Sequence, residues 1–194
     1  PTTNLEGDYQ RWNAATAALV ARLMPARWRL APETIMRGLR DVAWPGRWQR
    51  IHIGATPVIL DATHNPEGAE QLDANLAKLV VETGRAPVVV TGATGERRAM
   101  AVLAAVARHA REINLVVPQQ DRAMPFEVLE RCIPTGYSGT VRRATLKEVF
   151  PHPDCCAVGA PGETVVVTGS LYLLGEVLER LNPDRPTESK LQDW

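Results

Sequence analysis

The strongest constraint on the fold is an alternation of short apolar runs, bounded by Gly or Pro, with longer helical stretches. Strands that are separated by helices pair in parallel. The runs that predict strands are residues 47–53, 57–61, 86–92, 112–118, 140–144 and 163–169. The last four of these runs have the composition of strands buried on both faces of a sheet. The helical stretches are residues 66–82, 96–110, 124–132 and 170–181.

These elements predict an α/β fold, a three-layer Rossmann-like domain over residues 44–182. Its sheet has six strands and is mostly parallel, with one antiparallel edge strand, because only the turn around "GATP" separates the first two runs. Two helices precede the domain: one covers residues 8–24 with Asp8 as its expected N-cap, and the other begins at Pro32. The polar residues 183–194 predict a loosely held tail.

Composition excludes several classes of protein. Lysine plus arginine (22) equals aspartate plus glutamate (22), so the chain has no electrostatic footprint for nucleic acid or an anionic membrane. No apolar run approaches the roughly 20 residues that span a bilayer, and no signal peptide is recognisable, so we expect a cytoplasmic protein. The adjacent Cys155 and Cys156 favour reduced thiols. With His152 they lack a further ligand at suitable spacing, so we predict no metal site.

Three predicted loops carry the polar residues that suggest a binding site. They are "DATHNP" after Leu60, "TGATGERR" after Val90 and "TGSLYLLGE" after Val167. Ligands of open α/β sheets bind at the carboxyl ends of the strands, where helix N-termini offer free amides. There Asp61 suits ribose hydroxyls, and Ser170 at a helix N-terminus suits a carboxylate or a phosphate.

Each residue also has an ordinary structural explanation. Asp61 and Asn65 are suitable caps for the helix near Pro66, and Ser170 is a suitable cap for the last helix. His64 is equally consistent with a hydrogen-bonded histidine of a loop, and Arg47 with a solvated surface arginine. Two nucleotide motifs are absent: the chain has neither G-x-G-x-x-G nor the G-x-x-x-x-G-K-[ST] phosphate loop, so it has no triphosphate cradle of its own.

Four segments resemble one known family. In order, "GDYQRWNAATA", "WPGRWQRI", "VILDATHNPEGAEQL" and "VVVTGSLYLLGEV" are similar to segments of the folylpolyglutamate synthase/dihydrofolate synthase family within the Mur ligase superfamily. Family members carry a larger N-terminal ATPase domain with the phosphate loop. The resemblance implies that residues 44–182 are a Mur ligase-type C-terminal domain, and that residues 1–43 are the closing helices of the central ATPase domain and a linker.

The resemblance implies an ATP-dependent amide ligase that joins L-glutamate to a folate or dihydropteroate carboxylate through an acyl phosphate. Carried over by motif, Asn13 faces the adenine, Arg47 the phosphates and Asp61 the ribose. His64 and Ser170 lie near the incoming glutamate, so Arg47 and His64 are the expected catalytic residues. The implied Mg²⁺ is bound mainly by the chain's own N-terminal ATPase domain, so this chain alone is expected to be inactive.

The sequence leaves the family pattern in one place. Where members have an Asp-Lys-Asp run, this chain has "TGATGERRAM", and alignment on Gly92 puts Glu96 at the lysine position. We expect Arg97 or Arg98 to hold the glutamate carboxylate instead. The ordinary alternative is two solvated arginines.

Two other functions remain open from the sequence. One is a Mur-type peptidoglycan-precursor ligase domain. The other is a non-catalytic binding module on the same scaffold. The choice between folate and dihydropteroate is not encoded in these residues.

Overall fold

The computed structural model describes residues 1–183. The chain divides into two compact units, Pro1–Gln49 and Arg50–Trp194. The predicted tail, residues 183–194, lies outside the described residues apart from Pro183.

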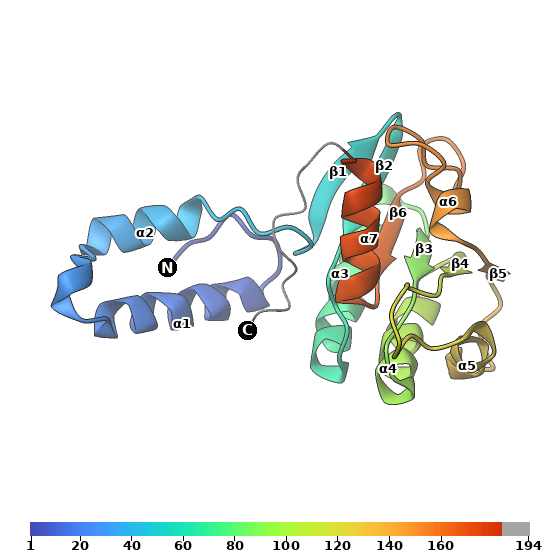
Figure 1. Cartoon of the computed structure of the whole chain (residues 1–194), viewed down its shortest axis with the longest axis horizontal. Helices are drawn as coiled ribbons and strands as arrows, with labels where there is room; N and C mark the ends of the chain where they lie inside the picture. The colour runs from blue at the N-terminus through green and yellow to red at the C-terminus, as the bar shows by residue number, and fades with distance from the viewer. Residues whose placement is uncertain (184–194) are drawn as a thin grey trace. The chain divides into compact units, whose positions relative to one another are not determined.

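The first unit is a helical pair. Helix α1 (Tyr9–Leu23) and helix α2 (Pro32–Arg40) are joined through a short 3₁₀ turn, η1 (Ala26–Trp28) (Figure 1). The prediction of two helices before the sheet is confirmed. Asp8 occupies the N-cap position of α1, as expected, but its side chain makes no capping bond. Its φ of −61° and ψ of −33° are already helical, whereas an N-cap residue normally has an extended backbone.

The second unit is built around a six-stranded sheet in the order β1-β2-β6-β3-β4-β5. Strand β1 is antiparallel to β2, and all other neighbours are parallel, so the predicted α/β fold with an antiparallel edge is confirmed. The strands are β1 (Gln49–Ile53), β2 (Thr56–Leu60), β3 (Val88–Thr91), β4 (Glu112–Leu115), β5 (Thr140–Arg143) and β6 (Val165–Thr168).

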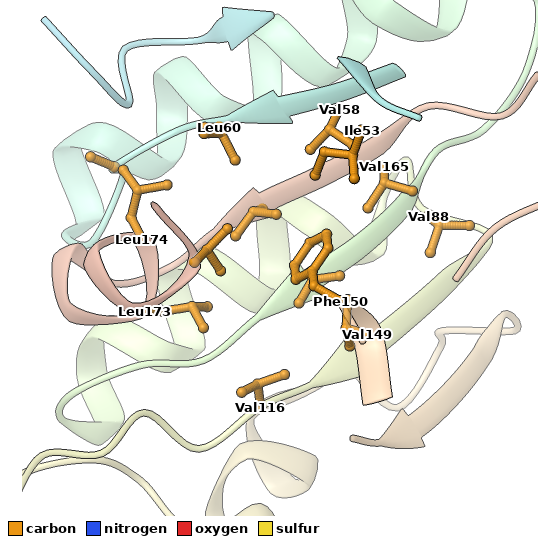
Figure 2. Packing of buried hydrophobic residues seen from close by; sticks show 14 residues of the cluster. Ile53, Val58, Leu60, Val88, Val116, Val149, Phe150, Val165, Leu173 and Leu174 are labelled. Carbon is orange, nitrogen blue, oxygen red and sulfur yellow. The ribbon is translucent and has the colours of Figure 1, made fainter. Parts of the chain in front are cut away.

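Helices cover the sheet. Figure 1 shows them as α3 (Pro66–Thr83), α4 (Glu96–Ala107), α5 (Phe126–Cys132), α6 (Leu146–Val149) and α7 (Leu171–Leu181). On the α7 side, Val58, Val88 and Val165 pack with Phe150 and Leu173 in one buried cluster, which Figure 2 shows from close by. The alternate strand residues point the other way, toward the layer where α3, α4 and α5 pack side by side.

Strand β6 brings the carboxyl ends of its neighbours together. Val167 pairs with Leu60 of β2 on one side and with Val90 of β3 on the other. The loops after β2, β6 and β3 therefore leave the sheet at the same level. This is the edge where ligands of parallel sheets bind.

Two features differ from the sequence prediction. All four residues of β5 are exposed, so its predicted burial on both faces is wrong. The reason is its place: β5 is the outermost strand, and edge strands commonly carry charged residues such as Arg142 and Arg143. The short α6 was not predicted, although Thr145 and Glu148 form a capping box at its start.

Candidate functional site

The loop after β2 places a carboxylate at the strand end. Asp61 is 3% exposed, and its backbone N–H donates to the Val167 carbonyl over 2.9 Å. Its Oδ1 accepts from the Thr63 N–H over 3.1 Å, which forms a tight local turn. Asp61 therefore bonds within its own loop and does not cap α3.

The cap of α3 is Asn65. Its Oδ1 accepts from the Gly68 N–H over 2.8 Å, and Pro66 takes the first helical position. The capping explanation is therefore confirmed for Asn65 and wrong for Asp61. A Cβ at position 68 would lie 2.9 Å from Asn65 Oδ1, so the glycine makes room for the cap.

His64 is held by its own loop. Its Nδ1 lies 2.8 Å from the Ala62 carbonyl oxygen, which accepts only, so Nδ1 carries the proton. In the neutral ring, Nε2 is then the acceptor. The loop thus fixes both the ring and its tautomer.

Ser170 is the N-cap of α7, as the ordinary explanation predicted. It is 2% exposed, and its Oγ accepts from the N–H groups of Tyr172 and Leu173 at 3.2 Å and 3.5 Å. Those bonds leave the hydroxyl proton available as a donor. Just before it, the buried Thr168 Oγ1 has no hydrogen-bond partner among residues 1–183.

Gly169 holds the strand-end loops together. Its N–H donates to the Thr63 carbonyl over 2.9 Å, which joins the loop after β6 to the loop after β2. Its φ is +102°, and a Cβ would lie 2.4 Å from Thr91 Oγ1 and 2.6 Å from the Gly92 carbonyl oxygen. The loops that carry Asp61 and Ser170 therefore meet the end of β3 at this glycine.

The predicted arginine pair lies beside these loops. Gly95, with a φ of +97°, turns the chain into α4, and Arg97 and Arg98 are exposed in its first turn. Both line a cavity of about 770 Å³ that Asn65 also lines. The same cavity is lined by Arg122, a residue that the sequence analysis did not single out.

In the first unit, Asn13 and Arg47 are brought to one smaller cavity of about 300 Å³. Asn13 Nδ2 donates to Gln10 Oε1 over 2.9 Å. Gln10 is 3% exposed, and its buried Nε2 has no partner among the residues that the structure describes. The sequence did not indicate the buried amide of Gln10, because Gln10 is one of several polar residues on α1.

The described residues also bear on metals, thiols and membranes. No group of three or more His, Cys, Asp or Glu side chains among residues 1–183 is arranged to hold a metal ion. Cys132, Cys155 and Cys156 are free, and burial raises the pKa of Cys132 and of Cys156. Within the same range, every helix is too short or too polar to cross a bilayer.

Comparison with known proteins identifies the scaffold. Residues 46–171 match the family described as Mur ligase, glutamate ligase domain. The chain is 30% identical over 183 residues to a folylpolyglutamate synthase of Lacticaseibacillus casei, a match that covers 91% of this chain and 39% of the relative. It is 35% identical over 97 residues to a UDP-N-acetylmuramoyl-L-alanyl-D-glutamate–2,6-diaminopimelate ligase of Aquifex aeolicus, covering 50% of this chain and 18% of the relative.

A solved structure gives the same result. The Mycobacterium tuberculosis folylpolyglutamate synthase in complex with ADP has 26% identity and a TM-score of 0.66, over 91% of this chain and 40% of that one. The chain thus spans 18 to 40% of the length of these relatives. The resemblance seen in the motifs is confirmed. The chain belongs to the Mur ligase family and contains the C-terminal, glutamate ligase domain of the folylpolyglutamate synthase/dihydrofolate synthase type.

Proposed function

We propose that this chain is the C-terminal part of an ATP-dependent ligase that adds L-glutamate to a carboxylate of folate or dihydropteroate. One observation carries the proposal. Asp61, His64 and Ser170 lie at a single edge of the sheet, on loops that are hydrogen-bonded to each other, in a domain of the glutamate ligase type. A carboxylate, an oriented imidazole and a helix N-terminus are groups suited to a nucleotide and an amino acid.

The reaction has two transfers. The substrate carboxylate attacks the γ-phosphorus of ATP and ADP leaves, which gives an acyl phosphate. The amino group of glutamate then attacks the acyl carbon, phosphate leaves, and the nitrogen loses a proton to give the amide. In this scheme the Arg47 guanidinium binds phosphoryl oxygens through paired hydrogen bonds and stabilises charge that develops on them.

The residues present fit a nucleotide. Asn13 and Gln10 present amides at the cavity that Arg47 also lines, and the unpaired Gln10 Nε2 is a donor suited to a ring nitrogen of adenine. Asp61 is assigned to the ribose hydroxyls. The ADP in the mycobacterial relative supports a nucleotide at the level of the family.

The glutamate is assigned to the other side of the strand-end edge. His64 Nε2 and the Ser170 hydroxyl proton remain for its polar groups, since their other hydrogen-bonding positions are used within the loops. Arg97 or Arg98 binds a carboxylate of glutamate in the cavity beside α4. We assign the Mg²⁺ and the triphosphate mainly to the protein's own N-terminal ATPase domain, because this chain lacks a phosphate-loop motif.

The test is ATP-dependent addition of labelled glutamate to dihydropteroate and to a reduced folate. The longer protein, with its phosphate loop, is expected to form the product, and the 194-residue chain alone is not. Folate-dependent ATP hydrolysis by the chain alone would contradict the division between domains. Absence of product from the longer protein with both acceptors would refute the ligase assignment.

The arginine assignment has its own assay in the longer enzyme. We expect Arg97→Ala or Arg98→Ala to raise KM for glutamate. Arg131→Ala, an exposed arginine of α5 outside the cavity lining, is the matched control. If neither α4 variant raises KM, both residues are ordinary solvated arginines.

A second candidate function is a peptidoglycan-precursor ligase. It is favoured by the similarity to the Aquifex ligase, which extends over half of this chain. A UDP-N-acetylmuramoyl-peptide acceptor in the same assay separates the two, since only one class of acceptor is expected to form an amide with the labelled glutamate.

A further inference from the structure

We propose that Arg122 selects the amino-acid substrate by binding the carboxylate of the substrate's side chain. The cavity beside α4 then binds both carboxylates of a dicarboxylic amino acid. The inference rests on the proposed ligase function. It adds a specificity-determining residue from a second loop, the one between β4 and α5.

Backbone contacts fix Arg122 beside the start of α4. Thr94 and Ala123 form an isolated antiparallel bridge, and the Met124 N–H donates to the Ala93 carbonyl over 2.9 Å. The loop after β4 is thereby bonded to the loop after β3. Arg122, the neighbour of the bridged Ala123, lines the same cavity as Arg97 and Arg98.

The loop that carries Arg122 is also anchored at its other end. The Gln119 N–H donates to Glu176 Oε1 of α7 over 2.7 Å. Nearby, a Cβ at Gly92 would lie 2.1 Å from the Val116 carbonyl oxygen, so the ends of β3 and β4 approach as closely as a glycine allows. The position of Arg122 is therefore set by several contacts on both sides of it.

The charges in the cavity complement a dicarboxylic amino acid. Within residues 1–183, Arg97, Arg98 and Arg122 make no ion pair and no side-chain hydrogen bond, whereas many other arginines of the unit are paired. Glu67 and Glu96 line the same cavity, so the balance of three cations and two anions is +1. Glutamate, with two carboxylates and one ammonium group, has a net charge of the opposite sign. Its carboxylates can pair with the arginines of the cavity, and its ammonium group can pair with a glutamate side chain.

The order of the strands decides which carboxylate Arg122 receives. In the order β2-β6-β3-β4, the loop after β4 lies one strand farther from Asp61 than the start of α4, which follows β3. Neighbouring strands are about 4.8 Å apart, a spacing of the same order as that between the two carboxylates of glutamate. The α-carboxylate adjoins the reacting amine and belongs with Arg97 or Arg98, and the side-chain carboxylate then reaches Arg122.

The experiment is a titration of the ¹⁵N-labelled 194-residue chain with L-glutamate and with L-glutamine, followed by NMR. We expect glutamate to saturate the backbone signals around Thr94 and Ala123 at a concentration at least about 10-fold lower than glutamine, as one lost charge-assisted hydrogen bond predicts. Arg122→Gln should remove this preference, and Arg122→Lys should keep part of it, because lysine retains the charge without the planar fork. Arg131→Gln is the matched control and should retain it.

Each outcome decides the proposal. Loss of the preference in Arg122→Gln but not in Arg131→Gln supports it, provided that both variants melt at the temperature of the unmodified chain. Retention of the preference in Arg122→Gln overturns it, as does equal binding of glutamate and glutamine, or no saturable binding, by the unmodified chain. Because no turnover is measured, this failure is distinguishable from failure of the ligase function, which is assayed as product from the longer protein.

Discussion

Gly169 offers the sharpest test of how the strand-end loops are assembled. It joins β6 to Ser170 with a φ of +102°, a conformation that side chains rarely adopt. In Gly169→Ala the new Cβ would lie 2.4 Å from Thr91 Oγ1 and 2.6 Å from the Gly92 carbonyl oxygen. The backbone oxygen has little freedom to move, so the loops must separate or the backbone must change conformation.

The expected loss of stability follows from two contributions. A non-glycine residue in an unfavourable backbone region costs about 1–3 kcal/mol. Forcing an extra carbon into a packed site costs about as much again, so the free energy of unfolding should fall by roughly 2–6 kcal/mol. For a chain of this size, 1 kcal/mol shifts Tm by about 2–4 °C, so Tm should fall by roughly 5–20 °C.

Thermal unfolding followed by circular dichroism measures this difference on the chain itself. The control is Gly175→Ala in the following helix α7, where no atom lies within 4 Å of the new Cβ. Alanine there should raise the stability by about 0.5–1 kcal/mol, since glycine is unfavourable inside a helix. If Gly169→Ala melts within about 2 °C of the unmodified chain, which is less than the smallest expected loss, the close contact of the loops is refuted.

Three further changes test the site and the ion pairs. Asp61→Asn keeps an acceptor for the Thr63 N–H, so Tm of the longer enzyme should hold while its affinity for ATP falls about 10- to 100-fold; unchanged affinity in an ATP titration would remove Asp61 from the nucleotide site. Arg47→Ala should lower kcat at least about 10-fold with little change in Tm, and an unchanged rate would make it a surface residue. A hydrogen bond from Arg111 holds the pKa of the Glu163 carboxyl below its usual 4.5, so this pair stabilises the fold above that pH and its contribution is lost as the pH falls further. Glu163→Gln should therefore show a smaller drop in Tm between pH 7 and pH 3 than the unmodified chain, and an equal drop would contradict the assignment.

The sheet was predictable because strands that are buried on both faces appear in the sequence as continuous apolar runs. Three consecutive valines, Val165, Val166 and Val167, stand at the centre of the predicted run 163–169, and they make up most of the fully buried β6. The exposure of β5 was not predictable from its residues, since Thr140–Arg143 has a strand composition and only the strand order makes it an edge. The brief α6 has a capping signal but too few residues for a helical period.

The candidate site was predictable only in part, for a similar reason. Asp61, His64 and Ser170 follow predicted strands directly, so the parallel sheet alone brings them to one edge. Arg122 lies seven residues beyond Leu115, the last residue of β4, and its place depends on the bridge from Thr94 to Ala123. A bridge between two irregular loops has no periodic signature, so sequence patterns do not reveal it.

The exposed strand β5 affects the behaviour of the chain at high concentration. An open edge presents unpaired N–H and C=O groups, on which another molecule can build an additional strand. Here Arg143 is paired with Glu127 and Glu130 of α5, and the exposed Arg142 is paired with Glu112 of β4. A second copy that approached edge to edge would have to strip water from these guanidinium groups and bring like charges together. The arginines of β5 thus oppose growth of the sheet into larger aggregates.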